Sequence, residues 1–110
     1  MVTCCDDILE FTADVSFEAF ERDKMRRFAT ERQLEILGEA ANHVSAGARE
    51  QLTEIEWSRV VGLRNKLAHD YGEVLAERVW RIAVSSVPTL RSQLAAVEEV
   101  RSALKDSATE

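Results

Sequence analysis

The chain has 110 residues, of which 45% are hydrophobic and 31% are charged, and these proportions are typical of one soluble globular domain. Four glycines and one proline provide few turn residues for a sheet protein, so the composition predicts an all-α fold. The net charge of −6 argues against broad, unspecific nucleic-acid binding, which depends on Lys and Arg along the phosphates, so any RNA contact has to be local.

No apolar run approaches the about 18 residues that a membrane-spanning helix needs, and the N-terminus lacks the basic-then-apolar pattern of a secretion signal. We therefore expect a cytoplasmic protein without membrane contact. Cys4 and Cys5 are adjacent, which rules out an ordinary disulfide between them and leaves no CxxC or Cys/His array for zinc. We expect two reduced thiols, no metal site and no cofactor.

Two short helices are expected at the start of the chain. The first covers about residues 4–14 and has an apolar side formed by Ile8, Leu9 and Phe11. Ser16 is a suitable N-cap for a second helix through Phe20, in which Glu18 occupies the first turn, where an acidic side chain is favourable.

A long central helix is expected over about residues 22–44, because its apolar residues recur with helical spacing. These residues are Met25, Phe28, Ala29, Ile36, Leu37, Ala40, Ala41 and Val44. Gly38 inside this helix is unfavourable by about 1 kcal/mol relative to Ala. It therefore predicts the close approach of a neighbouring helix.

Three further helical segments are expected after the central helix. Residues 48–52 form one short turn, and a helix then begins at about Glu56 and ends near 69–72, where Gly72 is placed to terminate it. The last helix covers about residues 75–104 and bends near 85–87, because Pro88 removes an internal hydrogen bond. Its expected buried face consists of Val79, Trp80, Ile82, Ala83, Val87, Leu90, Leu94 and Val97.

These segments predict an antiparallel helical bundle of about four to five helices in a single domain over 1–110, with 105–110 as a frayed tail. The two tryptophans, Trp57 and Trp80, are expected to be core or interface anchors rather than base-stacking platforms.

The run Arg64-Asn65-Lys66-Leu67-Ala68-His69-Asp70-Tyr71 places a permanent cation, a carboxamide, an imidazole and a phenol within two helical turns. Arginine offers a fixed fork of donors that suits a phosphate, and histidine transfers protons near neutral pH. This combination indicates phosphodiester chemistry. RNA cleavage without a metal would use His69 for proton transfer, Arg64 to hold the scissile phosphate, and Asn65 to position the imidazole or the substrate.

Arg64 and His69 are five residues apart, which directs them about 140° away from each other on an ideal helix. Either the helix ends before His69 and the chain turns the imidazole inward, or a two-fold axis brings the motifs of two subunits together. A dimer would also supply two imidazoles, one as base and one as acid.

The spacing Arg-x4-His-x-Tyr resembles the signature of the HEPN-domain superfamily, and specifically of HepT-like toxins that pair with MntA-like minimal nucleotidyltransferase antitoxins. Further blocks resemble this family in order and spacing over about residues 6–104, although the first helix is shorter than is usual there. The blocks are Ser16-Phe17-Glu18-Ala19-Phe20, Leu34-Glu35-Ile36-Leu37-Gly38-Glu39-Ala40-Ala41, Glu56-Trp57, Val79-Trp80 and Pro88-Thr89-Leu90.

The resemblance implies a HEPN-like bundle, a homodimer whose paired motifs line a shared cleft, and an endoribonuclease toxin acting on tRNA or mRNA. It also implies that a nucleotidyltransferase antitoxin neutralises the toxin by adding AMP to the motif tyrosine, here Tyr71. The chain has neither the Gly-Ser nor the paired-Asp metal motif of a nucleotidyltransferase, so it would be the substrate of that reaction.

Other interpretations of these residues remain open. Arg64 could simply pair with Glu39, which would otherwise orient it as a supporting residue, and His69 could be a helix C-cap. The basic stretch 22–32 could flank an RNA groove or be a solvated helix face. The candidate RNA-contacting cations are Arg26, Arg27 and Lys66.

Two other functions compete with the ribonuclease. The domain could be a non-catalytic module that binds a nucleotide or docks a nucleotidyltransferase, or it could be a purely structural helical adaptor. His43 has no partner motif and is expected to be an ordinary surface residue.

Overall fold

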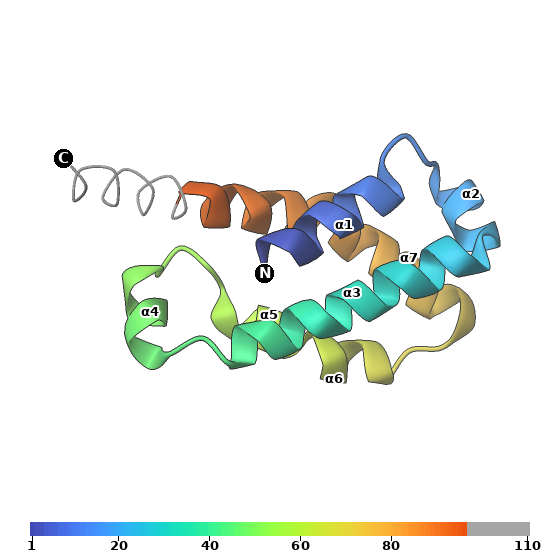
Figure 1. The fold of residues 1–110 in the computed structure, drawn as a ribbon. Coiled ribbons are helices and arrows are strands. Elements are labelled where there is room, and N and C mark those ends of the chain that lie inside the picture. The colour runs from blue at the N-terminus through green and yellow to red at the C-terminus, as the bar shows by residue number, and fades with distance from the viewer. Residues whose placement is uncertain (97–110) are drawn as a thin grey trace.

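The computed structural model describes residues 1–96, which form seven α-helices, one π-helical turn and a further helical segment (Figure 1). In chain order these are α1 (Val2–Thr12), α2 (Phe17–Arg22), α3 (Lys24–Asn42), α4 (Ala46–Gln51), α5 (Trp57–Val61), α6 (Leu63–Ala68), α7 (Gly72–Arg81), the π-helical turn Ile82–Ser86 and helical residues 87–96. The all-α prediction is confirmed. The described residues contain more and shorter helices than the four to five expected, and the expected end of the last helix near 104 lies outside them.

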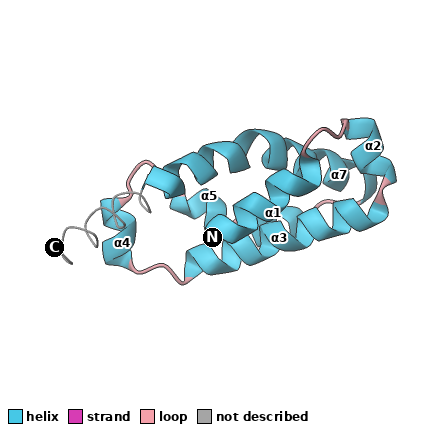
Figure 2. Ribbon diagram, turned by 45° about the horizontal axis from the view of Figure 1, so that its top comes forward, coloured by secondary structure: helices cyan, strands magenta, loops and turns pink. Residues whose placement is uncertain are grey.

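The long helix α3 forms the middle of the bundle. It contacts α1, α2, α5, α6 and α7, and α1 runs beside it in the opposite direction (Figure 1). Figure 2 shows the same arrangement from another side, with helices joined by short loops and no strand in the described part. No helix of the described residues is long and apolar enough to cross a membrane.

Short polar side chains begin three of the helices. Ser16, Asp23 and Ser45 each accept a hydrogen bond from a backbone N–H in the first turn, of α2, α3 and α4 respectively. The bond from the Arg26 backbone N–H lowers the pKa of the Asp23 carboxyl, because it favours the charged form. The predicted N-cap at Ser16 is thus confirmed, and the cap at Asp23 makes α3 begin at Lys24, two residues later than expected.

The core is continuous between α1, α3 and the C-terminal helices. Its fully buried residues include Cys5, Ile8, Phe20, Leu34, Leu37, Val79, Ala83 and Val87. Trp80 packs on Phe17 and Phe20, with ring centroids 6.1 and 5.1 Å away, and the Trp57 indole N–H donates to the Leu52 carbonyl at 3.1 Å. Both tryptophans are therefore anchors of the packing, as predicted.

The apolar face predicted for α3 is wrong at its first two turns. Met25 and Phe28 are exposed, whereas Thr30 is buried, with its hydroxyl donating to the Arg26 carbonyl at 2.8 Å. The hydroxyl satisfies its hydrogen bond within the helix, so burial of Thr30 needs no other polar partner. Periodicity could not distinguish these faces, because apolar residues occur on both.

Gly38 lies at a point where α3 and α5 are in close contact. A Cβ atom built on Gly38 would lie 3.0 Å from the Val60 carbonyl oxygen and 3.6 Å from the Leu63 Cβ. The predicted close approach of a neighbouring helix is confirmed, and it brings α6 next to the C-terminal half of α3.

The helix expected from Glu56 to 69–72 is divided at Gly62, which separates α5 from α6. A side chain at Gly62 would be tightly packed, because its Cβ would lie 3.1 Å from the Ser58 carbonyl oxygen. Gly72 does not end α6, which stops at Ala68. Instead Gly72 is the first residue of α7, in a left-handed conformation with φ +56°.

The bend predicted before Pro88 takes the form of the π-helical turn Ile82–Ser86. The Val87 N–H donates to the carbonyl of Ile82, five residues back, so the helix accommodates the missing N–H of Pro88 by widening one turn. The helix then continues through 87–96.

Candidate active site

Helix α6 carries the motif and presents most of it to solvent. Leu63 and Leu67, four residues apart, are buried against the core, and Arg64, Asn65 and Lys66 are exposed between them. This is the ordinary division of an amphipathic helix into a buried and an open face. The motif therefore projects outward from a helix whose position is set by two buried leucines.

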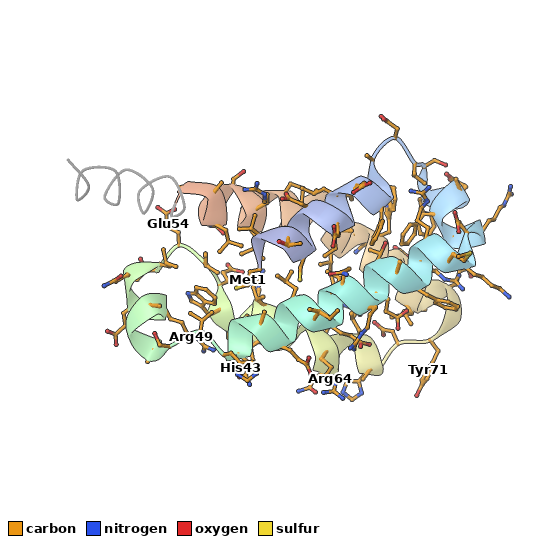
Figure 3. All side chains as sticks on the ribbon, viewed as in Figure 1. Met1, His43, Arg49, Glu54, Arg64 and Tyr71 are labelled. Carbon is orange, nitrogen blue, oxygen red and sulfur yellow. The ribbon has the colours of Figure 1, made fainter. Side chains whose placement is uncertain are left out.

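Arg64 forms an ion pair with Glu39 of α3, with 3.7 Å between Nη1 and Oε1. The side chains are 69% and 57% exposed, respectively. Such an exposed pair contributes at most about 1 kcal/mol to stability, so stabilising the fold is a weak reason for its presence. The contact does restrict where the guanidinium can lie, and Figure 3 shows Arg64 on the outer edge of the molecule.

His69 occupies the C-cap position of α6, with φ −90° and ψ −8°. The alternative interpretation of His69 as a helix C-cap predicted this position. The imidazole is exposed, and it has no hydrogen bond, ion pair or ring contact with the described residues. His69 is thus available to a ligand, and its side chain does not bond the carbonyls at the end of α6.

The Tyr71 side chain is 81% exposed and has no hydrogen-bond partner among residues 1–96. It extends outward on the same edge of the molecule as Arg64 (Figure 3). The backbone at Tyr71 is extended and leads directly to the left-handed Gly72 at the start of α7. A phenol in this position is accessible to another protein.

Asp70 lies between these two exposed residues and behaves differently. Its carboxylate is 13% exposed and accepts a hydrogen bond from Nε of Arg78, which lies two turns along α7. The sequence analysis did not identify this pair. No local pattern indicates it, because Gly72 reverses the chain between the two residues.

The three candidate RNA-contacting cations do not lie at one place. The Arg26 guanidinium donates to the Phe11 carbonyl at 2.6 Å, and that of Arg27 donates to the Glu21 carbonyl at 3.0 Å. Arg26 precedes Glu39 by 13 residues on α3, which corresponds to about 20 Å along a helix. Lys66 is on α6 but points toward a cavity that Arg64 does not line.

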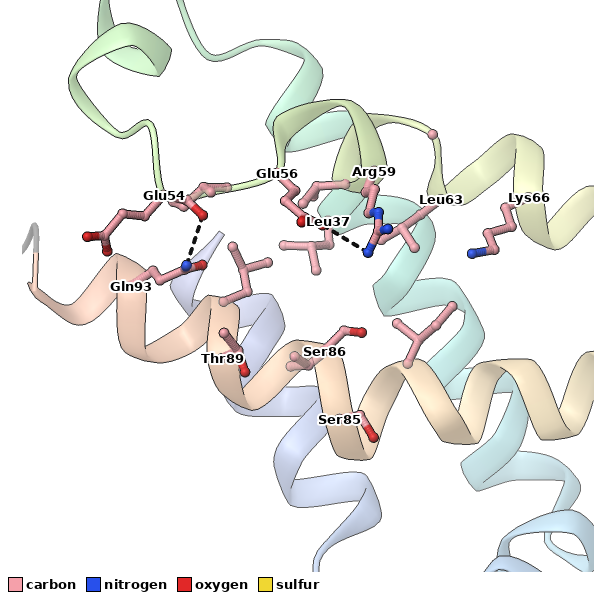
Figure 4. Close-up of a pocket in the computed structure, with 16 residues that line it drawn as sticks. Leu37, Glu54, Glu56, Arg59, Leu63, Lys66, Ser85, Ser86, Thr89 and Gln93 are labelled. Atoms are coloured by element: carbon pink, nitrogen blue, oxygen red, sulfur yellow. Dashed lines mark hydrogen bonds and ion pairs between the residues drawn. The ribbon is translucent and has the colours of Figure 1, made fainter.

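That cavity has a volume of about 520 Å³ and lies between α5–α6 and the C-terminal helix (Figure 4). Its apolar floor includes Leu37, Leu63 and Leu90, and Lys66, Ser85, Ser86, Thr89 and Gln93 stand on its walls. Arg64 and His69 do not contribute to its lining. In a single subunit the motif therefore lies on an open surface.

Within residues 1–96, no three His, Cys, Asp or Glu side chains come together as ligands for a metal. Cys4 and Cys5 are both free thiols, and Cys5 is fully buried in α1. Burial raises the pKa of the Cys5 thiol to about 11, because the thiolate loses its hydration there. His43 is exposed at the end of α3, as expected.

Comparison with known proteins places this sequence in a family. The family model described as ribonuclease HepT-like matches residues 1–97. The chain belongs to the HepT-like family. The resemblance inferred from the motif and the surrounding blocks is thereby confirmed, whereas the pairing with an MntA-like antitoxin stays a prediction.

Three relatives of this HepT-like chain illustrate the similarity. A candidate RNase of Methanocaldococcus jannaschii is 36% identical over 89 residues, which are 81% of this chain and 82% of the relative. A candidate RNase of Caldanaerobacter subterraneus subsp. tengcongensis is 32% identical over 82% and 80% of the two chains. A protein of Thermococcus cleftensis, named as a candidate ribonuclease HepT, is 35% identical over 78% of each. No solved structure matches the chain.

Proposed function

We propose that this HepT-like chain is an endoribonuclease toxin that cleaves tRNA or mRNA without a metal, using Arg64 and His69. The observation that carries the proposal is that α6 presents a guanidinium, paired with Glu39 at 3.7 Å, and ends at an exposed imidazole that has no partner among the described residues. The family match and the relatives named as ribonucleases support the same activity.

The proposed reaction is an attack of the ribose 2′-oxygen on the adjacent phosphorus. One imidazole removes the 2′-hydroxyl proton, and a protonated imidazole gives a proton to the 5′-oxygen as its bond to phosphorus breaks. Arg64 stabilises the negative charge that builds on the phosphate oxygens, and Asn65 positions the imidazole or the substrate. The products are a 2′,3′-cyclic phosphate and a 5′-hydroxyl end.

We propose that the active form is a homodimer with a shared cleft. One subunit offers a single motif histidine, but the reaction uses a base and an acid at the same time. In one subunit the motif lies on an open surface outside the cavity lined by Lys66. Two motifs facing each other across a two-fold axis would provide both imidazoles and the second wall of a groove.

Kinetics of RNA cleavage test this proposal. Arg64→Ala and His69→Ala should each lower the rate of RNA cleavage about 100-fold or more. Bacteria that express His69→Ala should grow normally, whereas expression of the wild type should arrest their growth. His43→Ala is the matched control, because His43 is the other histidine and is also exposed. Arg59→Ala controls for loss of an exposed arginine. Undiminished cleavage by both motif variants would overturn the proposed mechanism.

We further propose that an MntA-like nucleotidyltransferase neutralises the toxin by adding AMP to Tyr71. The exposed phenol can reach a partner's active site, and an added phosphate would place negative charge and bulk near Arg64. Tyr71 is the single tyrosine of the chain, so a tyrosine-linked adenylate can have no other location.

Coexpression with such a transferase, followed by intact mass measurement, tests this regulation. The wild type should gain one or more AMP groups and lose ribonuclease activity, and Tyr71→Phe should retain activity and gain none. An unmodified wild type beside a transferase shown to be active on another protein would remove this part of the proposal.

One observation favours the alternative of a non-catalytic docking module. Tyr71 and Val74, at the start of α7, are both large and exposed, which is typical of a protein-binding surface. Such a module would bind a nucleotidyltransferase but release no RNA with cyclic-phosphate ends at any protein concentration. End analysis of the RNA products therefore separates the two functions.

A further inference from the structure

The chain segment that carries His69 and Tyr71 is held to the rest of the molecule at one side chain. After α6 ends at Ala68, residues 69 and 71 to 73 are all exposed, and Asp70 alone is partly buried. The backbone bonds of this segment are long and weak, since the Asp70 N–H donates to the Leu67 carbonyl and the Leu75 N–H donates to the Tyr71 carbonyl, both at 3.3 Å. The side-chain contact of Asp70 with Arg78 is therefore the main restraint on this turn.

This contact differs from the other ion pairs of the described residues. The Asp70 carboxylate, at 13% exposure, is the least exposed side chain in any ion pair found among residues 1–96. A charge held in this environment needs its partner, because water solvates it only in part. The Arg64–Glu39 and Arg91–Asp6 pairs also join separate segments, but their carboxylates are more than half exposed. Arg81 and Glu77 form an exposed pair within α7, one turn apart.

Helix α7 provides a fixed base for this contact. Ala76 and Val79 are fully buried on either side of Arg78, and Trp80 packs on Phe17 and Phe20 of the α2 region. The Nε donor of Arg78 thus has a defined position relative to the core. Nothing comparable fixes Gly72, since a Cβ built there would meet no atom within 4 Å.

We propose that Arg78 is a positioning residue of the active site, which acts through Asp70 to hold His69 and Tyr71 at a defined distance from Arg64. This inference rests on the proposed function of those residues. Arg78 itself does not contact the substrate in this proposal. Its guanidinium sets the path of the turn, and the turn sets the direction of the imidazole and the phenol.

The proposal explains why an imidazole without any contact of its own can serve in catalysis. A general acid or base has to lie within about 3 Å of the atom with which it exchanges a proton, and a misplacement of about 1 Å can lower a rate about 100-fold. Because His69 has no side-chain partner, only its backbone can provide this accuracy. The Asp70–Arg78 pair is the nearest fixed point on that backbone.

Kinetics of Arg78 variants in the full chain test the proposal. Arg78→Ala and Asp70→Asn should each lower kcat for a short RNA at least tenfold, with KM changed less than threefold, because Arg64 still holds the phosphate. Arg78→Lys keeps the charge, but its kcat should lie between those of Arg78→Ala and the wild type, since an ammonium lacks the planar Nε donor. Arg81→Ala, which removes the exposed pair on the same helix, should leave both parameters unchanged.

Amide hydrogen exchange provides a second readout that does not depend on cleavage. In Arg78→Ala, exchange at the hydrogen-bonded amides of His69 and Asp70 should become at least tenfold faster, while residues of α3 keep their rates. Arg81→Ala should leave exchange in the turn as in the wild type. If the wild type cleaves no RNA, the proposed function fails, and this measurement still decides whether Arg78 holds the turn.

The results divide clearly. Slower catalysis together with faster exchange confined to the turn would support a positioning role. Unchanged exchange at His69 and Asp70 in a folded Arg78→Ala protein would overturn it, whatever the activity. A general loss of protection in Arg78→Ala, shared by Arg78→Lys, would also overturn it, because Arg78 would then be a residue of overall stability.

Discussion

Gly38 of α3 and Val60 of α5 lie so close that a methyl group on Gly38 would come within 3.0 Å of the Val60 carbonyl oxygen. This contact involves the backbone of both helices and cannot be relieved by a rotamer change. It places the short helix α6, and with it Arg64, beside Glu39, the next residue after Gly38. The geometry of the candidate site thus depends on a glycine that takes no part in its chemistry.

Replacing this glycine should therefore destabilise the protein. Gly38→Ala would gain about 1 kcal/mol from helix propensity, but the clash with the Val60 carbonyl should outweigh that gain. We expect the free energy of unfolding to fall by about 1–2 kcal/mol in urea denaturation. Gly47→Ala is the matched control. It lies in α4 with nothing within 4 Å of the added methyl, and it should be neutral or stabilising. A stabilised Gly38→Ala protein would contradict the close approach.

Arg26 should prove to be a structural residue. Its guanidinium donates to the Phe11 carbonyl at 2.6 Å near the end of α1, so it joins α1 to α3. Arg26→Ala should lower the free energy of unfolding by about 1.5–3 kcal/mol, the range for a hydrogen bond to a charged group. Lys24→Ala, the removal of a nearby exposed cation without a partner, should have little effect. Weaker RNA binding with unchanged stability would instead support the predicted RNA contact of Arg26.

Arg49 should tie α4 to the end of α3. Its Nη2 donates to the Ala41 carbonyl at 2.8 Å, and its guanidinium lies over the Trp57 ring at 5.7 Å. Arg49→Lys keeps the charge but loses the planar group, and it should lower the free energy of unfolding by about 1 kcal/mol. Tryptophan fluorescence during denaturation measures this loss. Arg59→Lys, at an exposed ion pair of α5, should give no change, and an equal loss in both variants would contradict the assignment.

Cys5 should make stability depend on pH in alkaline solution. Burial raises the pKa of its thiol to about 11, above the value of about 8.5 for an unfolded cysteine. The raised pKa means that the protonated thiol favours the folded state. This contribution is complete below about pH 8.5 and is lost as the pH rises through about 11.

The comparison with Cys5→Ala isolates this effect. Between about pH 8.5 and 11 the free energy of unfolding should fall more steeply for the wild type than for the variant, which has no thiol at position 5. Cys4→Ala controls for the neighbouring thiol. Parallel pH profiles of the wild type and Cys5→Ala would show that the buried thiol does not titrate in this range.

Several features of the site were predictable because they depend on local chemistry. The motif residues follow one another on one helix, so their mixture of a cation, an imidazole and a phenol could be recognised without coordinates. The role of Gly38 followed from the unfavourable propensity of glycine inside a helix. The irregularity before Pro88 followed from the missing N–H of proline.

Other features escaped prediction for physical reasons. The motif helix is split at Gly62 into α5 and α6, and this split depends on how each of them packs against α3. The spacing of apolar residues does not reveal it. Met25 and Phe28 fit the apolar pattern of α3 but are exposed, because burial depends on which elements cover a face. The partners Asp70 and Arg78 are brought together by the left-handed turn at Gly72.

By itself the sequence determined an all-α protein of the HepT-like type and the short segment that holds its candidate chemistry, because composition, caps and motif spacing act over a few residues. The tertiary structure decided between the alternatives for Arg64 by pairing it with Glu39, and it alone brought Arg78 to Asp70 and turned the motif outward. These outcomes depend on contacts between distant segments, whose geometry is set by the packing of whole helices and is not encoded in any local pattern.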